Sequence, residues 1–551
     1  MPRVSTAIRL SRLAPLICVA LLAIGGCEKP AAQQQTTRKE RGFQPGPGEP
    51  LEESTQPAVA AAPAAPPAPV ASAASEPSAP ADAPPPKPSF ADWPKPTAVI
   101  VATGQLMGYI EPCGCSGLEN QKGGLARRHT LIRQLANDRG WNVVPLDVGS
   151  QVKRFGKQQE VKFASVVQGL RTMDYQAFTL GEGDLRLTPG ELLAALASND
   201  GTIREVVDSN VAVLARDLMP RSLVVEAGGL KIGVTAVLGE KFEQRLRGDE
   251  LVHQPPATAL AIAMNELQSQ KCDFYVLLAH APIEEARALA KESPIFDLVI
   301  ASGDTNLPTH ELEAVEGTKA KLMQVGLKAM DAGVIGIYPG QDPPLRYESV
   351  PLDSRFADSP EMLKLLADYQ DQLKELGLEE LGAKPQPAPS GRKFVGSETC
   401  GECHAKALAK WKETPHSHAT QSLVEPPNSR ASIPRHFDPE CISCHVTGWE
   451  PQQHYPFESG YLSLEKTPAL TNVGCENCHG PGSAHVAAEN SAGSLSADQI
   501  SKLRESMRLP LAGEAAEKKC AECHDLDNSP EFHKDGAFER YWKKIEHLGK
   551  D

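Results

Sequence analysis

The 551-residue chain is poor in aromatic residues, which make up 5% of it, and it carries no excess of positive charge. Its formal net charge of -14 argues against a nucleic-acid partner, because phosphate backbones are bound by basic surfaces. Beyond residue 24 the chain has no unbroken apolar run of the length that a transmembrane helix needs. We therefore expect a protein that neither binds nucleic acid nor crosses a membrane.

The first 27 residues indicate export. Three arginines precede an apolar run at residues 13–24, as in a signal peptide, and that run is too short to span a bilayer with ease. It leads to Ile24-Gly25-Gly26-Cys27, which resembles the lipobox of bacterial lipoproteins. We expect lipidated Cys27 to anchor the protein to a bacterial membrane, on its periplasmic face or at the cell surface. The alternative is an ordinary secretory signal, which also exports the chain.

Composition divides the remaining chain into four parts. Residues 28–95 are rich in Pro and Ala and cannot bury enough apolar surface to fold, so they are expected to form a disordered tether. Residues 96–355 alternate β-rich runs with amphipathic stretches, the pattern of an α/β domain, and include a hairpin signal at Gly228-Gly229. A charged helix and a Pro-rich linker are predicted for 356–393, followed by a mainly α-helical and irregular domain at 394–551.

The last part contains four CxxCH motifs, and these use all eight of its cysteines. This pattern attaches a c-type haem: the two thiols form thioethers to the porphyrin, and the adjacent His binds iron. A structural zinc site or a disulfide framework would not require a His at the fifth position of every repeat. We therefore predict four covalent haems, attached through Cys400, Cys403, Cys441, Cys444, Cys475, Cys478, Cys520 and Cys523, with His404, His445, His479 and His524 as proximal iron ligands.

The sixth iron ligand separates an electron carrier from an enzyme. A second His gives low-spin iron suited to electron transfer, whereas an open position lets a small molecule bind. Residues 394–551, which we call the tail, contain seven further histidines, so the sequence permits four bis-His haems without requiring them.

The tail resembles the tetrahaem cytochromes of the c-five-five-four type. The likeness rests on GSETCGECHAKALAKWKETPHSHA, on VGCENCHGPGSAHV, and on CAECH followed by YWKKIEH. It implies that His416 and His485 are distal ligands, with His547 a further candidate and His418 an alternative to His416. His436, His454 and His533 are as readily explained by surface or hydrogen-bonding roles. The family includes members with one five-coordinate haem, which keeps a catalytic iron open.

The α/β part resembles the metallophosphatase domain of 5'-nucleotidases, a sandwich of two sheets flanked by helices. The likeness lies in the order of its blocks: VIVATGQLMGYIEP, GGLARRHTLI, LDVGS, FTLGEGD, VLLAHAP and VIASGDTN. In that family Asp, Asn and His side chains hold two divalent metals. The corresponding positions here are Gln105, Met107, Ser150, Glu182, Gly183, His280, Asp304 and Asn306, of which only His280 matches.

The substitutions at these positions predict a fold that is kept and a hydrolytic activity that is lost. Gln, Met, Gly and Ser cannot hold the two cations that clamp the attacking and leaving oxygens. We therefore expect no divalent metal in the middle domain and a hydrogen-bonding role for His280. A rearranged site built from Glu182, Asp184 and Asp304 is the alternative.

Two features of the middle domain have no assigned role. Cys113 and Cys115 lie in a loop after the first expected strand, where α/β domains place ligands, and are poorly spaced for a mutual disulfide. They form a candidate site for a soft metal or a redox-active thiol pair, or they are loop thiols without a partner. Arg127 and Arg128 suggest either an anion site or an exposed helix face.

Together these patterns predict a lipid-anchored, extracytoplasmic multihaem cytochrome that passes electrons between redox partner proteins of unknown identity. Its phosphatase-like domain would serve binding or docking, and catalytic residues are not assigned. One alternative is a multihaem redox enzyme with an open iron. A second is a surviving phosphoesterase fused to a cytochrome.

Overall fold

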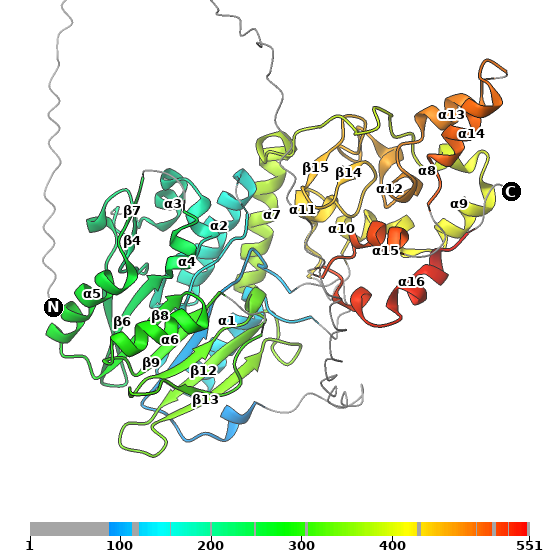
Figure 1. Ribbon diagram of the computed structural model, residues 1–551. Coiled ribbons are helices and arrows are strands. Elements are labelled where there is room, and N and C mark those ends of the chain that lie inside the picture. Colours follow the sequence, from blue (N-terminus) through cyan, green and yellow to red (C-terminus); the bar gives the residue numbers. More distant parts are fainter. Residues whose placement is uncertain are drawn as a thin grey trace, which may run out of the picture. The chain divides into compact units, whose positions relative to one another are not determined.

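The computed structural model describes residues 88–112, 121–154, 156–198, 201–246, 250–303, 307–426, 431–491, 493–509, 514–526 and 528–547 (Figure 1). Residues 82–551 cluster as one compact unit, in which the middle and carboxy-terminal domains contact each other. No helix of these ranges is both long and apolar enough to cross a membrane.

The middle domain is built on two sheets. The first has the order β13-β12-β1-β2-β3, and the second has the order β10-β11-β9-β8-β6-β5. The strands of the first sheet are β1 (Ala98–Thr103), β2 (Val143–Asp147), β3 (Ala177–Phe178), β12 (Asp331–Ile337) and β13 (Leu345–Pro351). Those of the second are β5 (Ser222–Ala227), β6 (Leu230–Leu238), β8 (Phe274–His280), β9 (Leu298–Ser302), β10 (Glu313–Ala314) and β11 (Lys321–Gln324). Strands β4 (Val211–Val213) and β7 (Leu251–His253) form a separate pair.

Alternate residues of the central strands enter different apolar layers. In β1, Ile100 faces the layer shared by the two sheets, whereas Val99 and Val101 face the layer that the first sheet shares with helices. All six β1 residues are buried, because both faces of the strand are covered. The helices are α1 (Leu125–Arg133), α2 (Lys157–Thr172), α3 (Pro189–Leu196), α4 (Glu240–Glu243), α5 (Pro256–Ser269), α6 (Ile283–Glu292) and α7 (Pro360–Glu380). The predicted two-sheet α/β sandwich is confirmed, and so is the hairpin, in which Gly228 and Gly229 both have positive φ.

Helix α7 packs in the core of the middle domain, although the predicted bounds placed this helix after that domain, together with the Pro-rich linker. The helix begins after Ser359, whose side chain accepts a hydrogen bond from the Met362 N–H, with Pro360 in the first turn. Leu366, Tyr369 and Leu373 are buried in the same apolar layer as α2.

At the amino-terminal end of the middle domain, Phe90 is buried, so ordered structure begins before residue 95.

The carboxy-terminal part consists of short helices and little sheet, as predicted. Its helices are α8 (Ser397–Gly401), α9 (Ala405–Lys412), α10 (Gln421–Val424), α11 (Pro439–Ile442), α12 (Cys475–His479), α13 (Ser483–Glu489), α14 (Ala497–Glu505), α15 (Glu514–Ala521) and α16 (Ala537–Ile545). One two-residue pair, β14 (Trp449–Glu450) with β15 (Tyr455–Pro456), completes it. Its apolar cluster is small and includes Ile442, Trp449 and Tyr461. A small cluster is expected where a bound group supplies part of the interior.

Candidate haem sites

Each motif forms a helical turn that brings its Cys and His to one side. The His404 N–H donates to the Cys400 carbonyl at 3.0 Å, and the His524 N–H donates to the Cys520 carbonyl at 2.9 Å. None of the eight motif cysteines forms a disulfide. Within the described ranges, no group of three or more His, Cys, Asp or Glu residues is arranged to hold a metal ion directly.

Three pairs of histidines face each other at one characteristic distance. Ring centroids lie 6.4 Å apart for His404 and His485, 6.1 Å for His416 and His524, and 6.0 Å for His479 and His547. Metal–imidazole bonds are about 2 Å long, and the ring centre lies about 1 Å further out, so two imidazoles across one iron have centroids about 6 Å apart. The observed spacing therefore fits a bis-His iron in all three pairs.

Hydrogen bonds orient three of the motif histidines, which are predicted to be proximal ligands. His445 Nδ1 donates to the Ala419 carbonyl at 2.8 Å, and His479 Nδ1 donates to the Met507 carbonyl at 2.7 Å. His524 Nδ1 lies 3.1 Å from the Ser529 hydroxyl. A bond at Nδ1 leaves the Nε2 lone pair for a metal. Burial is the main cause, and the neighbouring His416 the second, of a lowered pKa of about 4 for His524. The imidazole is therefore neutral and able to bind a metal ion.

Motifs that are distant in sequence meet in space. The thiol of Cys400 is within hydrogen-bonding reach of Cys475, and that of Cys444 is within reach of Cys523. A cavity of about 1030 Å³ lies along the second, third and fourth motifs, and both His445 and the exposed His418 line it. It exceeds the roughly 300–1,000 Å³ of ordinary ligand pockets. The first motif thus adjoins the third, and the second adjoins the fourth.

The cavity wall contains buried polar atoms that make no hydrogen bond within the described chain. They include the Trp542 Nε1, the Asn477 Oδ1 and the Gln370 Oε1. Buried polar atoms are rarely left unsatisfied in native proteins, so these atoms indicate a missing bound group. Together with the histidine pairs and free thiols, they show that the residues present fit covalent haem, which would supply the redox-active iron.

Glu476, inside the third motif, stabilises the surrounding loops in a way that the motif alone did not predict. Its buried carboxylate accepts N–H bonds from Gly396 at 2.8 Å, from Gly482 at 2.7 Å and from Val395 at 3.0 Å. A single carboxylate thus fastens the segment before the first motif to the segment after the third. The sequence signal was an acidic residue between the two cysteines, but its partners lie up to 81 residues away.

In the middle domain, three of the positions that correspond to metal ligands in 5'-nucleotidases have an unusual backbone conformation. Gln105, Met107 and Ser150 have φ values of 51°, 54° and 61°. Left-handed backbone is uncommon at residues other than Gly and clusters at functional sites. The side chains, however, make internal contacts: the Gln105 amide donates to the Val325 carbonyl at 3.2 Å.

His280 is buried and makes protein contacts. Its Nδ1 lies 2.8 Å from the Ser302 hydroxyl and 3.0 Å from the Val148 carbonyl, and its Nε2 lies 3.4 Å from the Ser150 hydroxyl. Burial lowers its pKa, so the ring is neutral. These contacts agree with the hydrogen-bonding role expected for it.

The other two acidic residues of this region that the structure describes also have protein partners. Glu182 pairs with Arg186 at 2.8 Å and with Arg245 at 3.1 Å. The Asp184 carboxylate accepts three backbone N–H bonds, from Ser150, Val152 and Gly181, each 2.9 Å long. Burial raises the pKa of Asp184 to about 7 even though these N–H bonds favour its ionised form. Both carboxylates therefore serve the packing of this region.

The interpretation of Arg127 and Arg128 as an exposed helix face was wrong. Arg128 is fully buried, with Nη1 3.5 Å from the Asp147 carboxylate and 3.4 Å from the Tyr175 hydroxyl. Arg127 is also buried and donates to the Gln121 carbonyl at 2.5 Å. A charged pair on a short helix gave no signal for burial, because the Arg128 partners Asp147 and Tyr175 are 19 and 47 residues away in the sequence. Cys27, Cys113, Cys115, Asp304 and Asn306 lie outside the described residues.

Comparisons with known proteins match the two halves separately. The family model described as "Cytochrome c554 and c-prime" matches residues 399–480. Cytochrome c-554 of Nitrosomonas europaea is 30% identical over 148 residues, which are 25% of this chain and 60% of that protein. An apyrase of Aedes albopictus is 20% identical over 297 residues, covering 49% of this chain and 53% of the apyrase. The chain thus spans between about half and 60% of the length of these relatives.

A solved structure, the 5'-nucleotidase precursor from Thermus thermophilus, aligns with a TM-score of 0.43 and 19% identity, covering 51% of this chain and 59% of that one. The sequence blocks and the two-sheet topology concern the middle region, and the apyrase alignment covers 49% of the chain. The haem motifs and the cytochrome match concern the tail. The chain therefore has a two-sheet α/β middle domain, is similar to an apyrase over about half of its length, and has a carboxy-terminal part that the cytochrome c554 family model matches at residues 399–480.

Proposed function

We propose that this protein is a lipid-anchored, extracytoplasmic tetrahaem cytochrome that carries electrons between redox partners. The observation that carries the proposal is the spacing of the three histidine pairs, 6.0 to 6.4 Å between ring centroids. Two imidazoles per iron favour low-spin haem and one-electron transfer without substrate binding. The pairwise approach of the motif cysteines supports closely spaced haems, as an electron relay requires.

Mass spectrometry of the mature protein tests haem attachment. We expect a mass increase of four haems and reversible one-electron steps in a potentiometric titration. An unmodified tail, or one loaded with zinc, would refute the proposal. Electron paramagnetic resonance then separates carrier from enzyme. Low-spin signals throughout support the carrier, whereas a high-spin iron that binds cyanide or nitric oxide would favour the redox-enzyme alternative.

Membrane attachment is tested at Cys27. We expect lipid-labelled protein in the membrane fraction, and a Cys27→Ser variant that is neither labelled nor retained there. Retention of the variant without label would refute lipid anchoring and leave the haem proposal intact.

We further propose that the middle domain has lost its two-metal activity and serves as a binding or docking module. The support is chemical: Gln105, Met107 and Ser150 are poor ligands for hard divalent cations, and Glu182 and Asp184 have protein partners. Release of phosphate from a nucleotide or an aryl phosphate, tested with several divalent metals on haem-loaded protein, should be absent. Metal-dependent turnover would refute this part.

A further inference from the structure

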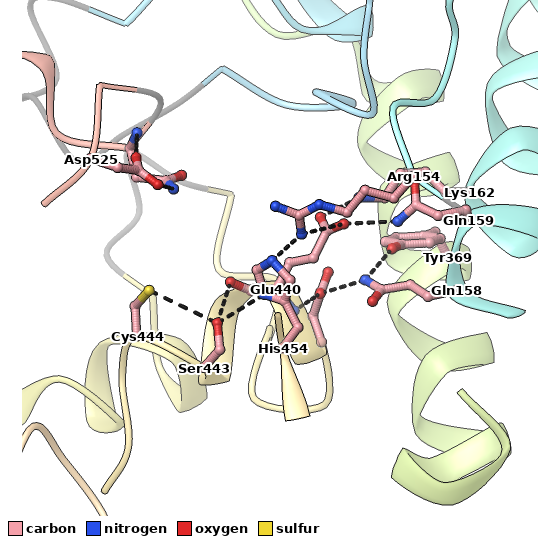
Figure 2. A network of polar contacts seen from close by, with 12 residues as sticks. Arg154, Gln158, Gln159, Lys162, Tyr369, Glu440, Ser443, Cys444, His454 and Asp525 are labelled. Carbon is pink, nitrogen blue, oxygen red and sulfur yellow. Dashed lines mark hydrogen bonds and ion pairs between the residues drawn. The ribbon is translucent and has the colours of Figure 1, made fainter. Parts of the chain in front are cut away.

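A polar seam joins the middle domain to the second haem motif. On one side are Arg154 and residues of α2 and α7; on the other is α11, the short helix that carries Cys441 (Figure 2). The seam consists of Arg154, Gln158, Gln159, Lys162 and Gln370 from the middle domain, and of Asp438 and Glu440 from the carboxy-terminal part.

Glu440, the residue directly before Cys441, is held by three side chains of the middle domain. Lys162 Nζ lies 2.5 Å from its Oε2, and the Gln159 amide donates to its Oε1 at 2.8 Å. Arg154 Nη1 lies 3.7 Å from Oε1. The Lys162 side chain is only 5% exposed and the Glu440 side chain is 28% exposed, so this ion pair is partly shielded from water. Burial alone would raise the pKa of Glu440, but Lys162 and Arg154 outweigh it and hold the pKa at about 2.

Asp438 is fixed from the same side. The Gln158 amide donates to its Oδ1 at 2.7 Å, and the Gln370 amide donates to its Oδ2 at 3.2 Å. Asp438 also accepts from the Glu440 N–H at 2.9 Å and so caps α11. The start of the haem-bearing helix is therefore fastened to α2 and α7.

The ion pairs across this contact run in both directions. The middle domain supplies the cations for Glu440, whereas in a neighbouring pair it supplies the anion: Glu111 accepts two bonds from Arg435, 2.6 and 2.5 Å long. The Arg435 side chain is 3% exposed. Reciprocal, desolvated pairs fix the orientation of two surfaces more strictly than one uniformly charged patch does.

A second chain of contacts reaches the other thiol of the motif. Arg154 contacts His454, the His454 Nδ1 lies 3.0 Å from the Ser443 hydroxyl, and that hydroxyl lies 3.9 Å from the Cys444 sulfur (Figure 2). Lys162, Tyr369 and Gln370 line the same cavity as His445. The middle domain thus contributes to the wall beside the second haem position.

From these contacts we infer that the middle domain is an electrostatic part of the second haem site and sets the reduction potential of the haem on Cys441 and Cys444 through Lys162 and Glu440. The inference rests on the proposed function, because it requires haem at this motif. Burial and charges around a haem are among the factors by which a protein sets its potential. Charges in a low-dielectric seam act far more strongly than surface charges do.

The sign of the effect follows from the charge of the iron. Reduction removes one positive charge, so a nearby cation favours the reduced form and a nearby anion favours the oxidised form. Lys162→Met should therefore lower the midpoint potential of one haem, and Glu440→Gln should raise it. A role limited to packing would not give shifts of opposite sign.

The experiment is a spectropotentiometric titration of the full haem-loaded chain. The expected result is a single reversible step that moves down in Lys162→Met, up in Glu440→Gln, and to an intermediate value in the double variant. Lys157→Met is the matched control. Lys157 lies on the same helix, is 41% exposed and pairs with Glu160 of that helix at 2.8 Å, and its loss should move no step.

Shifts of the same sign in both single variants, or no shift beyond that of the control, would overturn the inference. If a single variant does not fold, Gln159→Lys replaces it, because this change adds a cation beside Glu440 without removing an ion-pair partner. That variant must raise the midpoint of one step, and failure to do so overturns the inference. Absence of covalent haem in the unmodified chain would instead refute the proposed function.

Discussion

Asp184 offers a direct test of whether protein contacts alone hold together the region that corresponds to the metal site of 5'-nucleotidases. Its carboxylate accepts three backbone N–H bonds, all 2.9 Å long, from two separate loops. In Asp184→Ala all three donors lose their acceptor in a buried site. A buried unsatisfied donor costs about 1–3 kcal/mol, and neighbouring losses are not additive, so we expect destabilisation of about 3–6 kcal/mol. Asp184→Asn, which keeps one oxygen acceptor, should cost less.

The assay is urea unfolding of the full chain at pH 8, above the pKa of about 7 for this carboxyl. Tryptophan emission reports the middle domain, because Trp93 and Trp141 lie there and haem quenches the three tryptophans of the tail. The matched control is Glu182→Gln, whose partners Arg186 and Arg245 are about half exposed. Ion pairs with such partners contribute less than about 1 kcal/mol.

Two results would contradict the reasoning. A loss below about 1 kcal/mol in Asp184→Ala would show that the three N–H groups are satisfied by other means. A chelator that destabilises the unmodified chain but not the variant would show that Asp184 holds a metal ion.

Three further predictions concern the haem tail and the response to pH. His547→Ala removes the imidazole that faces His479, so one low-spin haem should become high-spin by electron paramagnetic resonance, while His253→Ala, at an exposed residue of the middle domain, should change nothing. Glu476→Ala leaves the N–H groups of Val395, Gly396 and Gly482 without their acceptor. Urea unfolding of the tail, followed by Soret absorbance, should therefore show a loss of about 3 kcal/mol or more in the free energy of unfolding, with a smaller loss in Glu476→Gln. Burial lowers the pKa of His129, so below about pH 6.5 the folded state binds fewer protons than the unfolded state. The contribution of His129 to the free energy of unfolding is therefore present above about pH 6.5. It is lost as the pH falls below that value, by at most about 1.4 kcal/mol per pH unit. His129→Gln should flatten this dependence in tryptophan-detected unfolding between pH 7 and 5, and an unchanged slope would count against it.

The sequence by itself predicted the features that depend on local spacing. Two Cys and one His within five residues define haem attachment wherever the chain folds, because the chemistry is confined to one helical turn. The alternation of β-rich runs with amphipathic stretches predicted an α/β domain, and Gly228-Gly229 predicted the hairpin, since both reflect short-range backbone geometry. The two-sheet sandwich was predicted from the resemblance to 5'-nucleotidases. The resemblance to 5'-nucleotidases, with Gln105, Met107 and Ser150 where that family has metal ligands, led to the prediction that no divalent metal is bound, and this stays a prediction.

Tertiary structure decided what depends on long-range contact. It brought His404 to His485 and His479 to His547 across 81 and 68 residues of sequence, which no periodicity could specify, because loops of any length can close such a pair. It buried Arg128, placed α7 in the core, and set Lys162 beside the carboxylate that precedes Cys441. Whether a charged side chain faces water or an opposite charge depends on which distant element packs over it, and only the folded chain determines that.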